Sequence, residues 1–403
     1  GSHGTAILNK TAARHMRTTI DAVSSAFHLH VGDGIFVGTD ERMTNRLMHD
    51  TADALERVGF EVNDRRESQP VVKLIGYESV RRPPTLRFLL EKGVRLERAM
   101  GWLACCQFVF VDAVSSLLGI WIHGALLRRD LLSIGNHIFL FVEKHRGQRV
   151  KWWPSARVEF LTMSRCIPLM SVSLASPRAR TVFASDAQGG GEQTDDDAGG
   201  YGIVATTVAS ELVDDLWRSS FVPGKCVAKL DGTLGSKWGS RSSLVPTTPF
   251  TRVPRSIFDS NWHTLAAGRW LYRGHITLGE ARAHVRIFQA LAAIPSAHAH
   301  TIAALEDDGA VSCAMAKGRS PAPGLNFYVR KRAASVLAAD ISAASPWVET
   351  GVMPADAASR GFGTVVPGPV DCGSCPECHH QKVHGDASKV PFVLAAQQLP
   401  ASA

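Results

Sequence analysis

Hydrophobic and polar positions recur with different periods along the chain, and each period predicts a different kind of element. Residues 26–38 form two β-rich arms around the turn formers Gly32 and Asp33, which predicts a hairpin. Apolar residues at helical spacing follow as far as Gly59 and predict an amphipathic helix, and the run V-V-K-L-I-G-Y predicts one further strand. Residues 81–178 carry long apolar faces with basic edges, so they are expected to be helical.

The helical segment contains visible interruptions. It opens at Pro83 and Pro84 and breaks at Trp152, Trp153 and Pro154. Within it, residues 100–127 are nearly apolar enough for a membrane span, but polar side chains interrupt the run. Because a charge at the centre of a span is costly in lipid, we expect a buried pair of helices here.

From residue 180 to residue 360 the pattern becomes mixed. Two β-rich runs, 181–188 and 201–207, flank a stretch rich in Gly and Asp, and an apolar helix face follows at Ala283, Ile287 and Leu291. The chain as a whole is therefore predicted to be an α+β (mixed α/β) protein.

Length and charge narrow the choice of partners. At 403 residues the chain is long enough for two or three domains, and its net charge of +7 is concentrated in basic residues between Arg81 and Lys151. A phosphate backbone is the natural partner of such a surface, and a basic face that contacts only water is the alternative. The eight cysteines show no disulfide framework, and the first residues are not a signal peptide. We therefore expect an intracellular protein of the nucleus or cytoplasm.

Four acidic residues stand where a metal site needs them. A β-rich run delivers Asp186 to its end, where the sheet fixes the backbone and leaves the carboxylate open to a ligand. Glu280, Asp307 and Asp356 lie in settings that could join it. Hard cations prefer oxygen ligands, so four converging carboxylates would form a pocket for two such ions.

Each of these carboxylates also has a structural interpretation. Glu280 could complete a capping box with Thr277 at the start of a helix. Asp307 and Asp308 could cap a helix over residues 309–317, and Asp356 could cap a terminal helix. Capping and metal binding are compatible, since a carboxylate at a helix N-terminus is well fixed.

The motifs around these residues occur in a recognisable order. F-A-S-D-A with G-Y-G, H-I-T-L-G-E-A-R-A, D-D-G-A-V, A-K-G-R-S with L-N, W-V-E-T-G and P-A-D-A-A-S-R resemble, in this order, the ribonuclease H domain of retrotransposon polyproteins. The resemblance implies a ribonuclease H-like domain with a mixed five-stranded sheet over residues 179–362. It implies cleavage of the RNA strand of RNA/DNA hybrids with two Mg²⁺ ions, or Mn²⁺ in their place. It makes four residues catalytic and metal-binding: Asp186, Glu280, Asp307 and Asp356. The nucleic-acid contacts that we predict are Lys317, Arg319, Ser320, Asn326, Lys144 and Arg146.

The chain departs from the family pattern in two places. The stretch G-G-G-E-Q-T-D-D-D-A-G separates the two β-rich runs and predicts a flexible acidic loop beside the site. Asp308 stands where the family often has Asn, so either Asp307 or Asp308 could be the ligand. Residues 222–255, rich in Gly, Ser, Thr and Pro, are predicted to be an extended excursion.

Upstream, the hairpin, helix and strand resemble the end of a reverse transcriptase palm, whose hairpin carries Tyr-x-Asp-Asp. In this alignment His30 takes the Tyr position, Gly32 replaces the first Asp, and Asp33 is the second. We therefore expect residues 1–80 to be a palm remnant without polymerase activity, with Gly32 and Asp33 as a degenerate motif. Residues 81–178 then correspond to a helical thumb and connection that grips a duplex, and a helical spacer is the alternative.

The tail over residues 363–403 is rich in Pro and Gly and then offers a cluster of Cys and His. The thiols and one imidazole could hold zinc, and a disordered tail is the alternative. The residues concerned are Cys372, Cys375 and Cys378 with His379, His380 or His384.

Two functions follow from the sequence. The first is a metal-dependent ribonuclease H that forms part of a retroelement polymerase. The second is a catalytically inactive, domesticated protein that binds nucleic acid or acts as a scaffold. No Walker loop and no H-E-x-x-H motif supports a rival chemistry.

Overall fold

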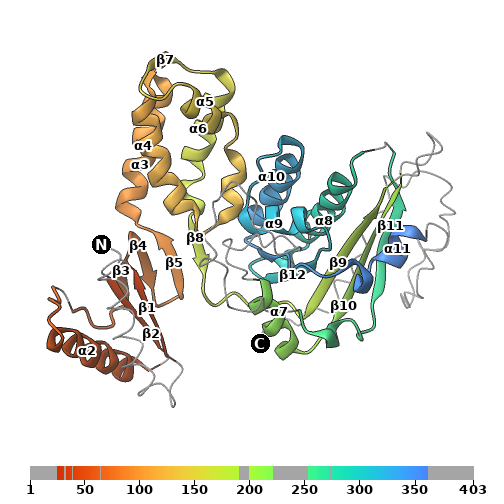
Figure 1. The fold of residues 1–403 in the computed structure, drawn as a ribbon, viewed down its shortest axis with the longest axis horizontal. Helices are drawn as coiled ribbons and strands as arrows, with labels where there is room; N and C mark the ends of the chain where they lie inside the picture. Colours follow the sequence, from red (N-terminus) through yellow and green to blue (C-terminus); the bar gives the residue numbers. More distant parts are fainter. Residues whose placement is uncertain are drawn as a thin grey trace, which may run out of the picture. The chain divides into compact units, whose positions relative to one another are not determined.

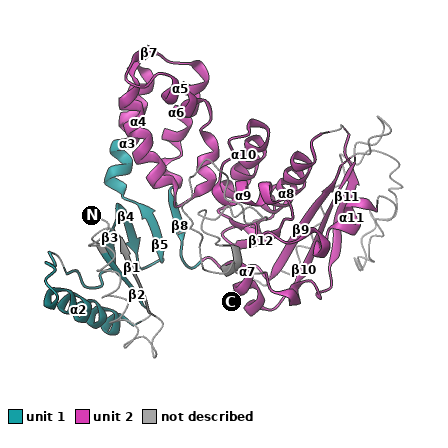
Figure 2. Cartoon of the chain, in the orientation of Figure 1, with its two compact units in different colours: residues 1–95, 170–175 teal, residues 96–169, 176–403 magenta. Residues whose placement is uncertain are grey.

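A computed structural model of the chain describes residues 25–30, 33–38, 40–63, 65–189, 199–220, 253–271 and 274–361. The chain divides into two compact units (Figure 2). Unit 1 comprises residues 1–95 and 170–175, and unit 2 comprises residues 96–169 and 176–403. The predicted division into a palm remnant, a helical connection, a sheet domain and a tail stays a prediction.

Unit 1 begins with the predicted hairpin and helix. Strand β1 (Ser25–His30) pairs antiparallel with β2 (Asp33–Gly38). Helix α2 (Glu41–Arg57) starts where Asp40 Oδ1 accepts a hydrogen bond of 2.7 Å from the Met43 amide. It ends just before Gly59, which has a φ of 89°, so both ends of this helix carry the expected local signals.

A four-stranded sheet completes unit 1, and here the single predicted strand is wrong. Two strands pair antiparallel across a turn at Ile75 and Gly76, whose φ angles are 45° and 83°. Pro83 and Pro84 do not open a helix. They lie in the turn between the strand of residues 77–80 and the strand of residues 85–88. The strands, in sheet order, are β3 (Val71–Leu74), β4 (Tyr77–Val80), β5 (Thr85–Phe88) and β8 (Ser171–Ser173).

The middle of the chain is mainly helical, as predicted, and a short two-stranded ribbon interrupts it (Figure 1). Met100 and Trp121 are fully buried in two helices, residues 90–105 and 111–125, which account for most of the nearly apolar run. No described helix is long and apolar enough to cross a membrane. Pro154 begins a helix, because at a first position its missing N–H is not needed. The elements are α3 (Leu90–Cys105), β6 (Phe108–Phe110), α4 (Val111–Ala125), η1 (Arg129–Ile134), α5 (His137–Lys144), β7 (Arg149–Lys151), α6 (Pro154–Arg165) and η2 (Ile167–Leu169).

A five-stranded mixed sheet follows, and it confirms the predicted fold class. Its order is β11-β10-β9-β12-β13. β10 runs antiparallel to both β11 and β9, whereas β12 runs parallel to both β9 and β13. The strands are β9 (Thr181–Gln188), β10 (Gly200–Thr207), β11 (His263–Arg269), β12 (Thr301–Leu305) and β13 (Ser342–Ala344).

Helices cover both faces of this sheet, as the alternation along β9 requires. Phe183 and Ala187 pack with the helices on one face, and Val182 and Ala184 pack on the other. The first face is covered by α8 (Ile276–Ala292) and α10 (Pro323–Ala338), with α9 (Gly309–Lys317) packed against them. The second face is covered by α7 (Ser210–Ser220), η5 (Arg255–Ile257) and α11 (Asp356–Arg360). Two short 3-10 helices complete this part of the chain: η6 (Pro295–Ala297) lies between α8 and β12, and η7 (Thr350–Val352) lies between β13 and α11.

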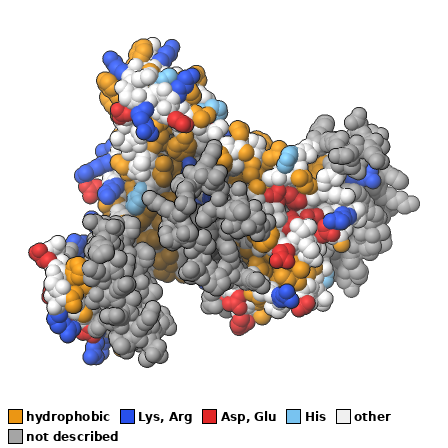
Figure 3. Space-filling view, viewed as in Figure 1, with side chains coloured by type: hydrophobic (Ala, Val, Ile, Leu, Met, Phe, Trp, Pro, Cys, Tyr) orange, Lys and Arg blue, Asp and Glu red, His pale blue; other side chains and the backbone are white. Residues whose placement is uncertain are grey.

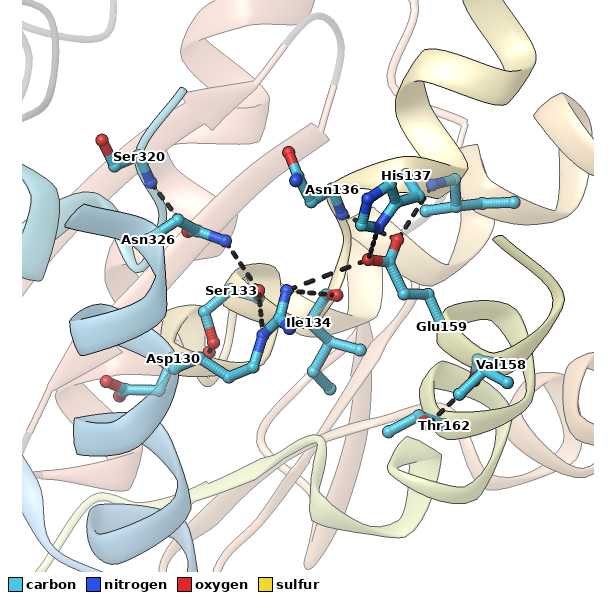
Figure 4. A network of polar contacts seen from close by, with 12 residues as sticks. Asp130, Ser133, Ile134, Asn136, His137, Val158, Glu159, Thr162, Ser320 and Asn326 are labelled. Carbon is cyan, nitrogen blue, oxygen red and sulfur yellow. Dashed lines mark hydrogen bonds and ion pairs between the residues drawn. The ribbon is translucent and has the colours of Figure 1, made fainter. Parts of the chain in front are cut away.

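Within unit 2, η1 joins the helical segment to the sheet half. A Cβ atom at Gly318 would lie 1.9 Å from the carbonyl oxygen of Arg129, so only glycine permits this approach. Arg332 Nη2 donates to Asp130 Oδ1 over 2.8 Å. The amide of Asn326 bridges the two parts, since it accepts from the Ser320 N–H and donates to the Ser133 carbonyl (Figure 4).

Candidate metal centre

The parallel pairing of β9 and β12 brings two predicted site residues to one edge of the sheet. Phe183 pairs with Ala304, and Ala184 pairs with Leu305. Continuing this register by two residues places Asp307 beside Asp186. The strand period therefore explains how residues far apart in sequence meet.

Glu280 reaches the same place from α8. The helix begins after His275, whose Nδ1 accepts from the Thr277 amide over 3.3 Å, so the capping-box interpretation of Glu280 is wrong. Glu280 lies more than a turn into the helix and is only 4% exposed. One carboxylate oxygen from each of Asp186, Glu280 and Asp307 lies within 4.8 Å of the other two.

Asp356 arrives on α11, and Gly202 on β10 makes this possible. A Cβ atom at Gly202 would lie 2.5 Å from the Ser359 nitrogen, so the G-Y-G motif lets the helix approach the strand. Ser359 Oγ donates a hydrogen bond to Asp186 Oδ2. Asp356 forms an ion pair of 2.5 Å with Arg360, and its carboxylate does not cap the helix.

The choice between Asp307 and Asp308 follows from the hydrogen bonds. Asp308 Oδ1 accepts from the Ala310 and Val311 amides over 2.7 and 3.1 Å, so Asp308 is the cap of α9. Asp307 faces the other carboxylates. Asp308 therefore has the structural role of a helix cap, and its neighbour Asp307 is the candidate metal ligand.

All four carboxylates line one pocket of about 390 Å³. Acidic side chains gather on the surface where Figure 1 places α8, β9 and α11 (Figure 3). A second pocket of about 690 Å³ lies at the opposite ends of β9 and β10, with Thr181, Thr207 and His263 in its lining. Among the described residues its lining includes a single carboxylate, Asp259, so hard-cation chemistry favours the first pocket.

Burial and mutual repulsion raise the pKa values of Asp186, Glu280 and Asp307. Burial raises the pKa of Asp186 to about 6, although the Ser359 hydroxyl opposes the shift. Burial and then the neighbouring Glu306 raise the pKa of Glu280. The pKa of Asp307 is also raised, mainly by burial. Without a cation, these three carboxyl groups therefore hold their protons more tightly than they would in water.

The donor set fits a hard divalent cation. The Oε2 atom of Glu280 is buried and has no hydrogen-bond partner among the described residues. Burying a carboxylate oxygen without a partner is energetically unfavourable. Coordination of that oxygen to a metal ion would remove this desolvation penalty. The site-facing ligand atoms are all carboxylate oxygens, which suit Mg²⁺ or Mn²⁺ better than soft metals.

A buried row of polar residues beside the site was also not anticipated from the sequence. Glu306 is fully buried between Leu305 and Asp307, and its Oε2 lies 3.2 Å from Nδ1 of the buried His284. His284 Nε2 lies 2.9 Å from Ser345 Oγ, which also accepts from Arg332. Burial, followed by the charge of Arg332, lowers the pKa of His284 to about 3, so this imidazole is neutral. The only local signal was the run E-D-D, which does not show which carboxylate points inward.

The predicted nucleic-acid contacts differ in accessibility. Lys317 and Arg319 are exposed at the C-terminal end of α9, and Lys144 and Arg146 are exposed at the end of α5. Asn326 is only 3% exposed, and its side-chain amide is hydrogen-bonded through both its oxygen and its nitrogen, so it holds two segments of the protein together and does not face a ligand. Several predictions lie outside the described residues: Gly32, the acidic stretch 190–198, residues 221–252, and the zinc candidates Cys372, Cys375, Cys378, His379, His380 and His384. The backbone of Asp33 begins β2.

No protein-family model matches the chain, and no curated protein matches it. Among solved structures, the chain is similar to the foamy viral protease-reverse transcriptase dRH in complex with double-stranded DNA, with 10% sequence identity and a TM-score of 0.32. The match covers 50% of this chain and 32% of that chain, so this chain spans about a third of that protein. A TM-score this low does not establish a shared fold.

Proposed function

We propose that this chain is a metal-dependent phosphodiester hydrolase of the ribonuclease H type, which cleaves the RNA strand of RNA/DNA hybrids within a retroelement polymerase. The observation that carries the proposal is the convergence of three carboxylate oxygens within 4.8 Å at the end of β9 and β12. Asp356 lines the same pocket.

The residues of the pocket have separate tasks in this proposal. Asp186, Glu280, Asp307 and Asp356 hold two Mg²⁺ ions. When bound, the ions lower the pKa of a water molecule and stabilise the charge on the departing 3′ oxygen. Ser359 orients the Asp186 carboxylate through its hydrogen bond. Exposed basic residues, Lys317 and Arg319 among them, bind the phosphates of the substrate.

A labelled RNA/DNA hybrid tests the proposal. We expect the wild-type protein to cut the RNA strand in Mg²⁺ and to cut nothing in a chelator. The variant Asp186→Asn keeps the size of the side chain and one oxygen but loses the charge that holds the ions. It should therefore lose cleavage and keep hybrid binding, because the basic residues are unchanged.

The outcomes separate this proposal from its alternative. A wild-type protein that binds the hybrid without cutting it in Mg²⁺ or Mn²⁺ would support the inactive binding or scaffold protein. A variant that cuts as fast as the wild type would show that the carboxylate pocket is not the active site.

A further inference from the structure

The ribbon of β6 and β7 shows an unusual outer face. Phe108 pairs with Lys151, Val109 with Val150, and Phe110 with Arg149. Residues that face each other in an antiparallel pair point to the same side, so two aromatic rings and two cations share one face.

Burial along the ribbon agrees with this assignment. Val109 is 1% exposed and faces the helices, whereas Phe108 and Phe110 are 48% and 63% exposed. The ribbon is well fixed, because the Val111 amide donates to the Gln148 carbonyl and the Gly147 amide donates to Asp112. The two rings are therefore displayed on a rigid support.

The cations of this face lack acidic partners. The Arg149 guanidinium lies 5.9 Å from the Phe108 ring centre and 5.7 Å from that of Phe110. In the described part of the chain, no ion pair joins Arg149 or Lys151 to a carboxylate. Lys144 and Arg146 add positive charge in the segment that leads into β7. Orange and blue side chains lie together over the end of unit 2 where Figure 1 labels β7 (Figure 3).

The combination favours one kind of ligand. An apolar protein partner would leave two desolvated cations unpaired, which is costly. A nucleic-acid strand satisfies both features, since its bases stack on aromatic rings and its phosphates pair with cations. Stacking needs a base whose face is free, and in a duplex neighbouring base pairs occupy those faces. Unpaired nucleotides therefore fit this face better than a duplex does.

We propose that the outer face of the β6–β7 ribbon, formed by Phe108, Phe110, Arg149 and Lys151, binds unpaired nucleotides. This inference rests on the proposed function in that it supplies a nucleic-acid substrate, and the ribbon would hold a single-stranded extension of that substrate. It involves none of the carboxylates.

Fluorescence anisotropy in a chelator tests the inference without any cleavage. The full chain is titrated into a labelled single-stranded oligonucleotide and into a blunt duplex of the same length. In the double variant Phe108→Ala with Phe110→Ala, single-strand affinity should fall about tenfold or more, because a stacked base contributes roughly 1–3 kcal/mol. Duplex affinity should change less than about twofold. Trp102→Ala, at a 70% exposed ring on α3, is the matched control and should change neither affinity.

A second variant tests the chemistry of the contact. Phe108→Leu with Phe110→Leu keeps apolar side chains and loses the flat rings, so nucleotide stacking predicts a loss of affinity. Unchanged single-strand binding in both double variants would overturn the inference. An equal loss for duplex and single strand would also overturn it, and so would self-association of the wild type that the alanine variant abolishes. Single-strand binding without hybrid cleavage would instead leave this inference standing and refute the proposed enzyme.

Discussion

Two groups of buried charge in unit 2 differ in one respect. In the first, Arg332 is 2% exposed and donates to Asp130, Ser345 and the Met315 carbonyl. In the second, Asp186 and Glu280 are 5% and 4% exposed, and Arg360, which lines the same pocket, is 62% exposed and paired with Asp356. The first group is compensated from within the protein, and the second is not.

This difference in charge compensation distinguishes a structural ion pair from a candidate metal site. A buried ion pair reinforced by further hydrogen bonds, here from both terminal nitrogens of Arg332, fixes one arrangement of the segments that it joins, η1 and α10. A buried group of like charges destabilises the fold unless something outside the protein neutralises it. The uncompensated group is therefore the one that we assign to a metal and a reaction.

The largest expected effect is on the uncompensated group. Glu280→Gln removes one charge and little volume, and we expect hybrid cleavage in Mg²⁺ to fall on the order of 10³-fold because the electrostatic contribution to catalysis is lost. Glu349→Gln is the matched control, since this exposed residue lies in the segment that leads to η7, and it should change the rate less than about twofold. Equal rates for the two variants would remove the functional distinction between the groups.

The next effect concerns the compensated group and is one of stability. Arg332→Met leaves the Asp130 carboxylate without its cation and removes one of the two contacts of Ser345 Oγ, so the free energy of unfolding should fall by about 3–5 kcal/mol. Arg330→Met is the control two residues away. Its guanidinium is about half exposed and donates to the Ser133 carbonyl, so its loss should cost about 1 kcal/mol. Urea unfolding followed by circular dichroism measures the free energy of unfolding of both variants. Similar losses in the two variants would show that the buried Arg332–Asp130 pair contributes no more to stability than a half-exposed arginine.

Local patterns predicted a good part of this arrangement. The β-rich run 181–188 became β9, and the helical spacing of Ala283, Ile287 and Leu291 became the buried face of α8. The five-stranded mixed sheet was implied by the order of the motifs and is present. These features depend on short-range periodicity, which the sequence displays directly.

The remaining features depend on tertiary contacts that have no local signal. Ile75 adopts a φ of 45°, which is unfavourable for a β-branched residue, so the turn that splits the predicted strand could not be anticipated. Ser359 meets Asp186 only because Gly202 admits α11 to the sheet. The inward position of Glu306 follows from the register of β12, which single-sequence patterns do not specify.

A smaller effect is expected at Ser359, whose hydroxyl donates to Asp186 in the uncompensated group. Ser359→Ala removes the donor that lowers the pKa of Asp186, so that pKa should rise and the acidic limb of the pH–rate profile should move to higher pH. Loss of the orienting bond should also reduce cleavage by about 10–100-fold. A lower rate with an unchanged pH profile would mean that Ser359 only packs α11 against β10.

The smallest effect is a change of stability with pH in the metal-free protein. Burial first, and then nearby carboxylates, raise the pKa of folded Asp186 from 3.8 to about 6, so the folded state holds this proton more tightly than the unfolded chain does. The resulting stabilisation is complete below about pH 4 and is lost as pH rises through 6. In a chelator, urea unfolding should therefore show the wild type losing up to about 2 kcal/mol between pH 4.5 and 7.5 relative to Asp186→Asn. Mg²⁺ at pH 7.5 should restore stability to the wild type and not to the variant. Parallel stability curves for the two proteins, with and without Mg²⁺, would show that the charge of Asp186 is compensated after all, and the contrast between the two buried groups would then not identify the site.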